Sequence, residues 1–394
     1  MAGSLVPSRS ARPVSLSDLS RSVPAAHGPQ WAGLRASLRE NSPLILFVMA
    51  FAPAPHIVAA RYSIETPPYT RIEVSYGAFI LTGFMASFVA FALWYLYNAR
   101  VRKVPGFQAI AMQRLKGDFL GRDRVLLALP VLLLWPITAC AFSYLKAVIP
   151  LIEPFHLDPT LYRLDKAVHF GIDPWRLLHP LLGYKPVTYL INYGYAMWFL
   201  VLQWSLVMQA ASTGDRRRRM QFLLTMALSW VLIGNVAATF LSSVGPCYYA
   251  LVFDGPDPYQ PLMAYLHEVE QALKVTIGGQ EVQVPFLALE LQDTLWQSQV
   301  NGDYGLAKGI SAAPSMHVAS SWIIARLAWS MGRTAKIFGS LFLLLILVGS
   351  VHLGWHYAID GYLAIAGAWV LWRLTGWWLD RPRVKAFLFA PARA

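Results

Sequence analysis

The chain has 394 residues, of which 56% are hydrophobic and only 14% are charged, and its mean hydropathy is +0.44. A soluble domain usually carries about a quarter charged residues, so this composition excludes an ordinary soluble globule. The formal net charge is +12. In a soluble protein that charge would indicate nucleic-acid binding, but in a membrane protein its meaning depends on where the charges lie. Two cysteines, Cys140 and Cys247, are too few for a disulfide framework.

Residues 1–41 are rich in Ser, Pro and Arg and contain no apolar run that could serve as a signal peptide. We expect them to form a disordered cytoplasmic tail. Beyond them, eight stretches approach the roughly 20 apolar residues that a helix needs to cross a bilayer. The first contains prolines and the seventh is short, so seven is the alternative count. The predicted spans are 42–60, 77–97, 125–147, 187–210, 221–245, 315–332, 337–353 and 358–378.

Basic residues are distributed around these spans as the positive-inside rule requires. With the N-terminus in the cytoplasm, the charges of the inside segments sum to +16 and those of the outside segments to −5. The run Arg216–Arg219 is then interpreted as a cytoplasmic anchor. The basic excess orients the chain in the membrane, and no nucleic-acid partner is needed to explain it.

Two segments between the spans are expected at the outer face. Residues 148–186 interleave apolar and charged side chains, which is typical of an interfacial segment. Residues 247–313 form the largest outer loop, mostly polar, and a loop of this length in a compact protein is usually functional. We expect this loop to act as a lid. Within it, alternating Val and Gln over 275–284, broken by two glycines, predict a small hairpin.

A first group of polar residues runs from Ser311 to His317, at the outer start of the sixth predicted span. Pro314 suits the first turn of a helix, where its missing N–H costs nothing. The free backbone N–H groups of that turn form a natural anion site. Ser315 adds a hydroxyl donor and His317 adds a titratable proton.

A second group runs from Ser350 to Asp360, at the outer junction of the seventh and eighth spans. His356 and Asp360 are four residues apart, so on a helix they would share a face and could form a hydrogen bond. A carboxylate bonded to one imidazole nitrogen fixes the tautomer and raises the basicity of the other, as an imidazole nucleophile requires. Because both groups lie on one face of the membrane, we predict a catalytic site built on His317, His356 and Asp360.

A metal site is the alternative for the same residues. His352 and His356 fit an H-x-x-x-H pattern and, with Asp360, could ligate a metal. The sequence offers no obvious further ligand, and Asp360 is equally well explained as an orienter of His356. We therefore expect neither a metal nor another cofactor, with His352 and Ser350 in supporting positions.

These motifs resemble those of the type 2 phosphatidic acid phosphatase superfamily of membrane lipid phosphatases and phosphotransferases. Pro314-Ser315-Met316-His317 is similar to the family's P-S-G-H motif, and the run ending at His356-Tyr-Ala-Ile-Asp360 is similar to S-R-x5-H-x3-D. The resemblance implies that His356 is a nucleophile forming a phosphohistidine and that Asp360 orients it. It also implies that His317 protonates the leaving oxygen and that Ser315 helps to bind the phosphoryl oxygens.

The resemblance further implies a division of the chain. A six-helix catalytic core would cover residues 125–380. Two accessory helices and a basic cytoplasmic loop would precede it over residues 42–124. A cytoplasmic tail would follow over residues 381–394.

The chain departs from the family's pattern at all three cations of the phosphate site. The Arg six residues before the nucleophilic His is Ser350, and the Lys and Arg of K-x6-R-P would fall at Ala238 and Gly245. These losses resemble the subgroup that contains the fungal inositol phosphorylceramide synthases. A phosphodiester carries one charge and needs fewer cations than a monoester dianion, and excess cations in a partly desolvated site are costly.

Ser311 and Lys308 are further candidates for phosphate binding. Lys308 is the nearest basic residue in sequence to the first motif and could partly replace the missing cations. A solvated loop lysine is an equally good explanation.

We therefore expect a phosphotransferase that moves a phosphoinositol-like head group from a phospholipid donor to a lipid alcohol acceptor. Its expected location is a bacterial inner membrane, with both termini cytoplasmic and the site at the periplasmic face. One alternative is a lipid phosphate or pyrophosphate phosphatase with water as acceptor. Another is a non-catalytic transporter or scaffold, which the missing cations favour and the retained His317, His356 and Asp360 disfavour.

Overall fold

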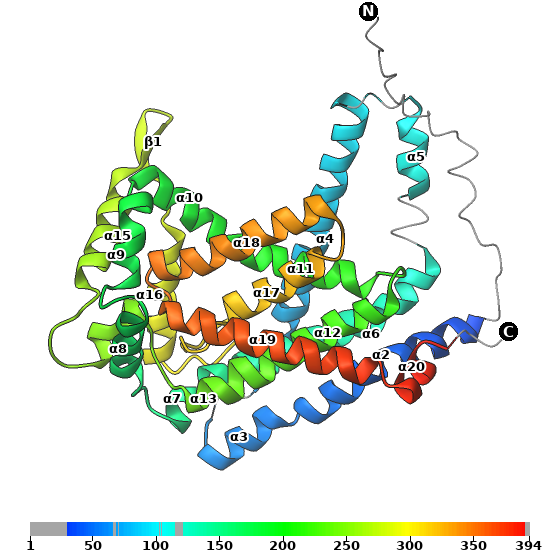
Figure 1. The fold of residues 1–394 in the computed structure, drawn as a ribbon, viewed down its shortest axis with the longest axis horizontal. Helices are drawn as coiled ribbons and strands as arrows, with labels where there is room; N and C mark the ends of the chain where they lie inside the picture. Colours follow the sequence, from blue (N-terminus) through cyan, green and yellow to red (C-terminus); the bar gives the residue numbers. More distant parts are fainter. Residues whose placement is uncertain are drawn as a thin grey trace, which may run out of the picture.

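The computed structural model describes residues 30–65, 68, 69, 71–101, 103, 105–114 and 121–390. Residues 1–29, the greater part of the expected N-terminal tail, lie outside the described residues, as do residues 391–394. The described chain forms a helical bundle with one two-stranded hairpin (Figure 1). The all-α membrane fold predicted from the sequence is confirmed.

The N-terminal part contributes two long helical segments. Helix α2 (Gln30–Phe51) begins well before residue 42, so residues 30–41 are helical although we expected a tail there, and α3 (Ala54–Tyr62) continues it. Helix α4 (Ile72–Leu96) continues into a π-helical turn, η1 (Tyr97–Val101), and the short α5 (Phe107–Arg114) follows.

The remaining long helices form the body of the bundle, and α17 packs against α18, α19 and α12 within it. They are α6 (Arg122–Ala147), α10 (Lys185–Ala196) with α11 (Trp198–Ala210), α12 (Arg216–Val231) with η3 (Leu232–Ala237) and α13 (Ala238–Phe240), α17 (Met316–Ala328), α18 (Arg333–His352) and α19 (Ala358–Leu379). The expected C-terminal tail contains a further helix, α20 (Pro382–Leu388), whose Leu388 is buried against Met220 and Leu224.

Six helical segments are long and apolar enough to cross a membrane, so the chain is an integral membrane protein. They correspond to the first five predicted spans and the seventh. The other two predicted spans correspond to α17, which has 13 residues, and to α19, which has 22. The count of about eight is therefore approximate, because α17 is shorter than a full span and is almost entirely buried among its neighbours.

Shorter elements form a cap at one end of the bundle, where α19 begins and α18 ends (Figure 1). The segment 247–313, which we expected to be an outer loop, is folded instead of open, and it buries Leu266, Val269 and Phe286 in the main core. The predicted hairpin is confirmed, with Val275 opposite Val282 in an antiparallel pair. The cap elements are α7 (Ile149–Ile152), α8 (Asp158–Val168), α9 (Pro174–Leu182), η4 (Pro246–Tyr248), α14 (Tyr249–Val252), α15 (Gln260–Ala272), β1 (Lys274–Ile277), β2 (Gln280–Gln283) and α16 (Leu287–Val300).

The opposite end of the bundle is held by a buried arginine. Arg219 was expected to anchor the chain at the cytoplasmic surface, but its side chain is fully buried. It pairs with Glu40 at 3.3 Å and donates hydrogen bonds to Asn41 Oδ1 at 2.9 Å and to the Ala210 carbonyl. Arg216 also pairs with Glu40. The arginine run therefore joins α12 to α2 inside the protein.

Removing the carboxylate of Glu40 should destabilise the fold strongly, because it leaves the buried Arg219 without its counter-ion. Glu40→Ala is expected to lower the free energy of unfolding by about 3–5 kcal/mol. The matched control is Glu281→Ala, which removes an exposed pair with Lys274 and should cost no more than about 1 kcal/mol. Denaturation of both variants in detergent measures the difference, and equal losses would contradict the structural role of Arg219.

Candidate active site

Three chain segments that are far apart in sequence meet beneath the cap. The backbone N–H of Ala312 donates to Ser243 O at 3.0 Å, and that of Cys247 donates to Gly354 O at 2.9 Å. Ser315 N donates to Asp360 O at 3.2 Å. These bonds bring the two sequence motifs together, and they add the segment in which the family's K-x6-R-P motif was expected.

His356 lies in the link between α18 and α19 and is 5% exposed. Its Nδ1 lies 2.9 Å from the carbonyl oxygen of Ala312. Because a carbonyl can only accept, Nδ1 carries the proton and Nε2 keeps its lone pair. Burial, followed by the positive charge of Lys146, lowers the pKa of His356 to about 3. The imidazole is therefore neutral at physiological pH, as a nucleophile must be.

Asp360 lies close to His356 but does not form the expected hydrogen bond with it. The residues do not share a helix, because α19 begins only at Ala358. The Asp360 Oδ2 atom is 3.6 Å from His356 Nδ1 and accepts from Tyr357 N at 3.0 Å. In this structure the Ala312 carbonyl orients the ring, and the carboxylate is placed to interact with charge that develops on it.

His317 faces His356 from the first turn of α17. The two ring centroids are 5.7 Å apart with an interplanar angle of 60°. Tyr195 stacks on His317 at 5.2 Å, and Trp198 contacts it at 4.2 Å. The Trp198 ring is held in place by a hydrogen bond from Nε1 to Ser320 Oγ. Aromatic walls on α10 and α11 thus fix one histidine opposite the other.

The two candidate serines are both buried. Ser315 is the N-cap of α17, and its hydroxyl accepts from Val318 N at 3.4 Å. The Ser311 hydroxyl is buried and has no hydrogen-bond partner among the described residues. An unpaired buried hydroxyl is costly, so Ser311 is available to a ligand, whereas Ser315 helps first to begin the helix.

The structure gives the two lysines of this region different surroundings. Lys308 pairs with Asp303 at 3.7 Å within the segment 247–313. Lys146, at the last turn of α6, has no ion pair in the part of the chain that the structure describes. Gly309 lies directly over the backbone of Lys146 and Ala147, where a Cβ would come within 2.7 Å. Lys146 therefore lies beside the segment that leads to Ser311, and its charge reaches His356.

His352 and Ser350 support the site indirectly. The Ser350 carbonyl accepts from His356 N at 3.0 Å, which positions the nucleophile through the backbone. His352 Nε2 bonds to Thr188 Oγ1 at 2.9 Å, and its ring faces His179 and Tyr265. The H-x-x-x-H pair is thus divided between two environments, and no group of three metal-binding side chains forms among the described residues.

Two buried carboxylates that the sequence reading did not single out hold the site in place. Asp158 on α8 accepts from the backbone N–H groups of Val244 and Gly245 and from Tyr357 Oη, at 2.8–2.9 Å. Asp165, two turns later, accepts from the first N–H groups of α19 at 2.9 and 3.1 Å. Burial raises the pKa of both carboxyl groups, and these hydrogen bonds oppose the rise.

Other contributors carried weak signals in the sequence. Lys146 is a cation in the last turn of an apolar helix that is long enough to cross a membrane, which is a functional signal by itself. Asp158 and Asp165 are spaced by seven residues, so they lie on one face of α8. Tyr195 and Trp198 resemble ordinary membrane aromatics in the sequence, and only the packing brings them to His317.

A model of the PAP2 superfamily matches residues 159–376, which is more than half of the chain. The chain belongs to this superfamily, and its function is of the lipid phosphatase or phosphotransferase type. The matched range contains His317, His356 and Asp360. Searches of curated proteins and of solved structures found no match.

Gly245 is the position at which the motif resemblance would place the family's arginine, and its surroundings in the structure explain a glycine there. Its φ is +97°, and a Cβ would lie 2.9 Å from the Trp355 carbonyl, next to His356. We expect Gly245→Ala to strain the backbone, displace Trp355 and greatly reduce turnover of a lipid phosphoester.

Gly255→Ala is the matched control, because its φ is +102° but nothing lies within 4 Å of the added Cβ. Both variants should lose about 1–3 kcal/mol of unfolding free energy through backbone strain. Only Gly245→Ala should lose activity, measured as product formed per folded protein. Equal activity in the two variants would contradict a role for this contact.

Proposed function

We propose that the protein is a membrane lipid phosphotransferase that moves a phospho-head group from a phospholipid to a lipid alcohol through a phosphohistidine on His356. The supporting observation is that His356 is buried and neutral and that His317 faces it, with 5.7 Å between the two ring centroids. Residues of the six-helix region 125–380 form this site, and the proposed location is the periplasmic face of a bacterial inner membrane. A phosphoinositol-like head group is the proposed cargo, on the resemblance of the motifs.

The first step uses the free Nε2 of His356. This atom attacks phosphorus, an Nε2–P bond forms, and the P–O bond to the leaving alcohol breaks. His317 in its protonated form gives its proton to the departing oxygen. The imidazole gains positive charge as the bond forms, and Asp360, 3.6 Å from Nδ1, stabilises that charge.

The second step reverses these roles with a new alcohol. The acceptor hydroxyl gives its proton to His317 and attacks phosphorus, the Nε2–P bond breaks, and His356 returns to its neutral form. Water would perform the same step and make the enzyme a phosphatase. The cap favours a lipid alcohol over water as the acceptor. Gln292 of α16 donates to the Leu353 carbonyl at 2.9 Å, so the cap covers the link that carries His356.

The presence of a single free lysine near His356, within the described part of the chain, favours a substrate that carries one negative charge. With the family's three cations absent, Lys146 is the free cation among the described residues whose charge reaches His356. One lysine and the unpaired Ser311 hydroxyl match the single charge of a phosphodiester. A monoester dianion would leave more charge uncompensated in a buried site.

The reaction is tested with purified protein, a labelled phospholipid donor and either ceramide or diacylglycerol as acceptor. Formation of a new phospholipid that depends on the acceptor supports the transferase. Release of inorganic phosphate from a monoester, with no new lipid, would overturn it in favour of a phosphatase. Absence of both products from folded protein would favour a non-catalytic role.

His356→Ala should reduce turnover by at least about 1000-fold, because it removes the nucleophile. His317→Ala should reduce it by about 100- to 10,000-fold through loss of proton transfer. His317→Ala is also expected to retain a slowly formed, acid-labile phosphoryl adduct that His356→Ala lacks. The control is His156→Ala, at an exposed site on the same face, which should leave turnover unchanged. An adduct in His356→Ala would contradict the assignment of the nucleophile.

Lys146→Gln should weaken transfer by about 10- to 100-fold, mainly in kcat/KM, since a charge-assisted contact to phosphate contributes about 1.5–3 kcal/mol. Lys308→Gln removes the same charge from the same outer region and should change the rate by less than about threefold. Rates of both variants with one diester donor measure the difference. A larger loss in Lys308→Gln would show that the loop lysine is the phosphate ligand.

A further inference from the structure

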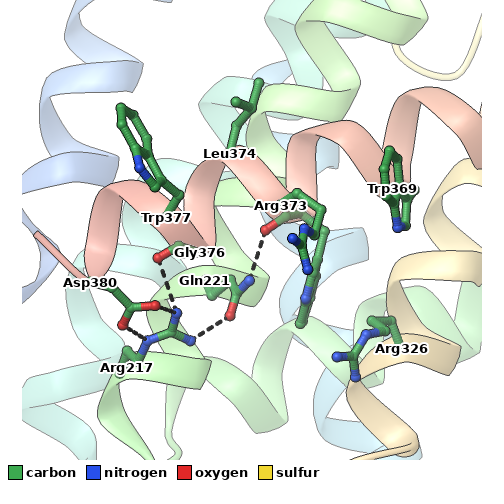
Figure 2. A pocket seen from close by; sticks show the side chains of 10 residues that line it. Arg217, Gln221, Arg326, Trp369, Arg373, Leu374, Gly376, Trp377 and Asp380 are labelled. Atoms are coloured by element: carbon green, nitrogen blue, oxygen red, sulfur yellow. Dashed lines mark hydrogen bonds and ion pairs between the residues drawn. The ribbon is translucent and has the colours of Figure 1, made fainter.

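A second polar site lies at the other end of α17 and α19. A cavity of about 720 Å³ opens there between α12, α17 and α19. Figure 2 shows Arg217 and Gln221 reaching into it from α12 and Arg326 from α17, while α19 supplies Arg373 and the tryptophans. This cavity lies on the basic side of the chain, where the inside segments carry their positive excess.

The cavity is separate from the histidine site. Arg326 is nine residues after His317 on α17, which is about 14 Å along the helix axis. Arg373 is thirteen residues after Asp360 on α19, which is about 20 Å. A ligand in this cavity would therefore not touch the reacting groups.

Two of the three arginines in the cavity lack a counter-ion. Arg217 forms a two-pronged ion pair with Asp380, with N···O distances of 2.7 and 2.6 Å, and donates to Gln221 and Gly376. Arg326 lies over the Trp372 ring at 5.5 Å. Within the described residues, neither Arg326 nor Arg373 has a carboxylate partner. The cavity thus keeps about two unpaired positive charges close to a membrane interior, which is costly unless an anion or water compensates them.

The rim of the cavity is apolar and accessible. Trp369 is 54% exposed and Trp377 is 59% exposed, and Leu374 lies between them on α19. A free inorganic anion would gain nothing from such a rim. A phospholipid would place its phosphate between the arginines and its acyl chains against the exposed rings.

We propose that this cavity binds the head group of an anionic phospholipid in the leaflet on the basic side of the membrane. The phosphodiester oxygens accept from Arg326 and Arg373, and the acyl chains lie along Trp369 and Trp377. Basic pockets between transmembrane helices on the cytoplasmic side are the type of site that takes such head groups. This proposal does not depend on the reaction at His356.

The test is a titration of the full-length protein in detergent with dihexanoyl phosphatidylglycerol, with the dissociation constant as the readout. R326Q/R373Q should weaken binding about 25-fold, from about fivefold for each arginine. R333Q/K336Q is the matched control, because it removes the same charge from exposed positions on the same side, outside the cavity. It should change the constant by less than about threefold.

His356→Ala should bind the lipid as well as the parent protein, since the two sites are separate. Dihexanoyl phosphatidylcholine should bind at least tenfold more weakly than the anionic lipid. If the double variant fails to fold, R373Q alone changes an exposed side chain and should weaken binding about fivefold.

Three results would overturn the proposal. One is undiminished lipid binding by folded R326Q/R373Q or R373Q. Another is an equal loss in R333Q/K336Q, which would show attraction to the surface charge in general. The third is inorganic phosphate competing with the same affinity as the lipid, which would identify a free-phosphate site.

Discussion

The catalytic end of the protein depends on two carboxylates buried on one face of α8. Taking a carboxylate out of water costs several kcal/mol, and the cost is offset only where donors surround it. Asp158 and Asp165 find those donors in backbone N–H groups at the end of one core segment and at the start of α19. His356 directly precedes Tyr357, whose hydroxyl also donates to Asp158. A short helix outside both sequence motifs therefore helps to position the link that carries the nucleophile, because its buried carboxylates bond to the residues on either side of that site.

In the part of the chain that the structure describes, few positive charges lie close to the two histidines, and this determines which substrate charge the site can bind. His356 is neutral because burial and Lys146 both disfavour its protonation. Asp360 uses one oxygen to cap the start of α19 through Tyr357, while its other oxygen has no partner among the described residues. One free lysine beside a neutral nucleophile suits a substrate with a single negative charge. The scarcity of cations that first suggested lost function is therefore consistent with a diester substrate.

Much of this architecture could be predicted from the sequence, because hydropathy and the distribution of basic residues are local signals that a bilayer makes strict. These signals predict the helical spans and the hairpin. They also predict that the two motifs lie close together. The predicted bond between His356 and Asp360 failed because it assumed a continuous helix, and α19 starts between the two residues. Arg219 was placed at the surface because the sequence cannot show that Glu40 lies opposite it. Lys146 lies near the site because α6 packs against the segment around Gly309, a contact that local sequence patterns do not contain.

The two ends of α17 and α19 differ in the charged residues that surround them. At one end lie His317 and His356 close to buried carboxylates, whereas the other end carries arginines beside exposed tryptophans. The small number of cations beside the histidines suits a substrate that carries a single negative charge. The arginine end is separate from the reacting groups, so a stronger positive charge is compatible with the lipid site proposed there. The same two helices therefore carry a reaction site with few cations at one end and the proposed arginine-lined lipid site at the other.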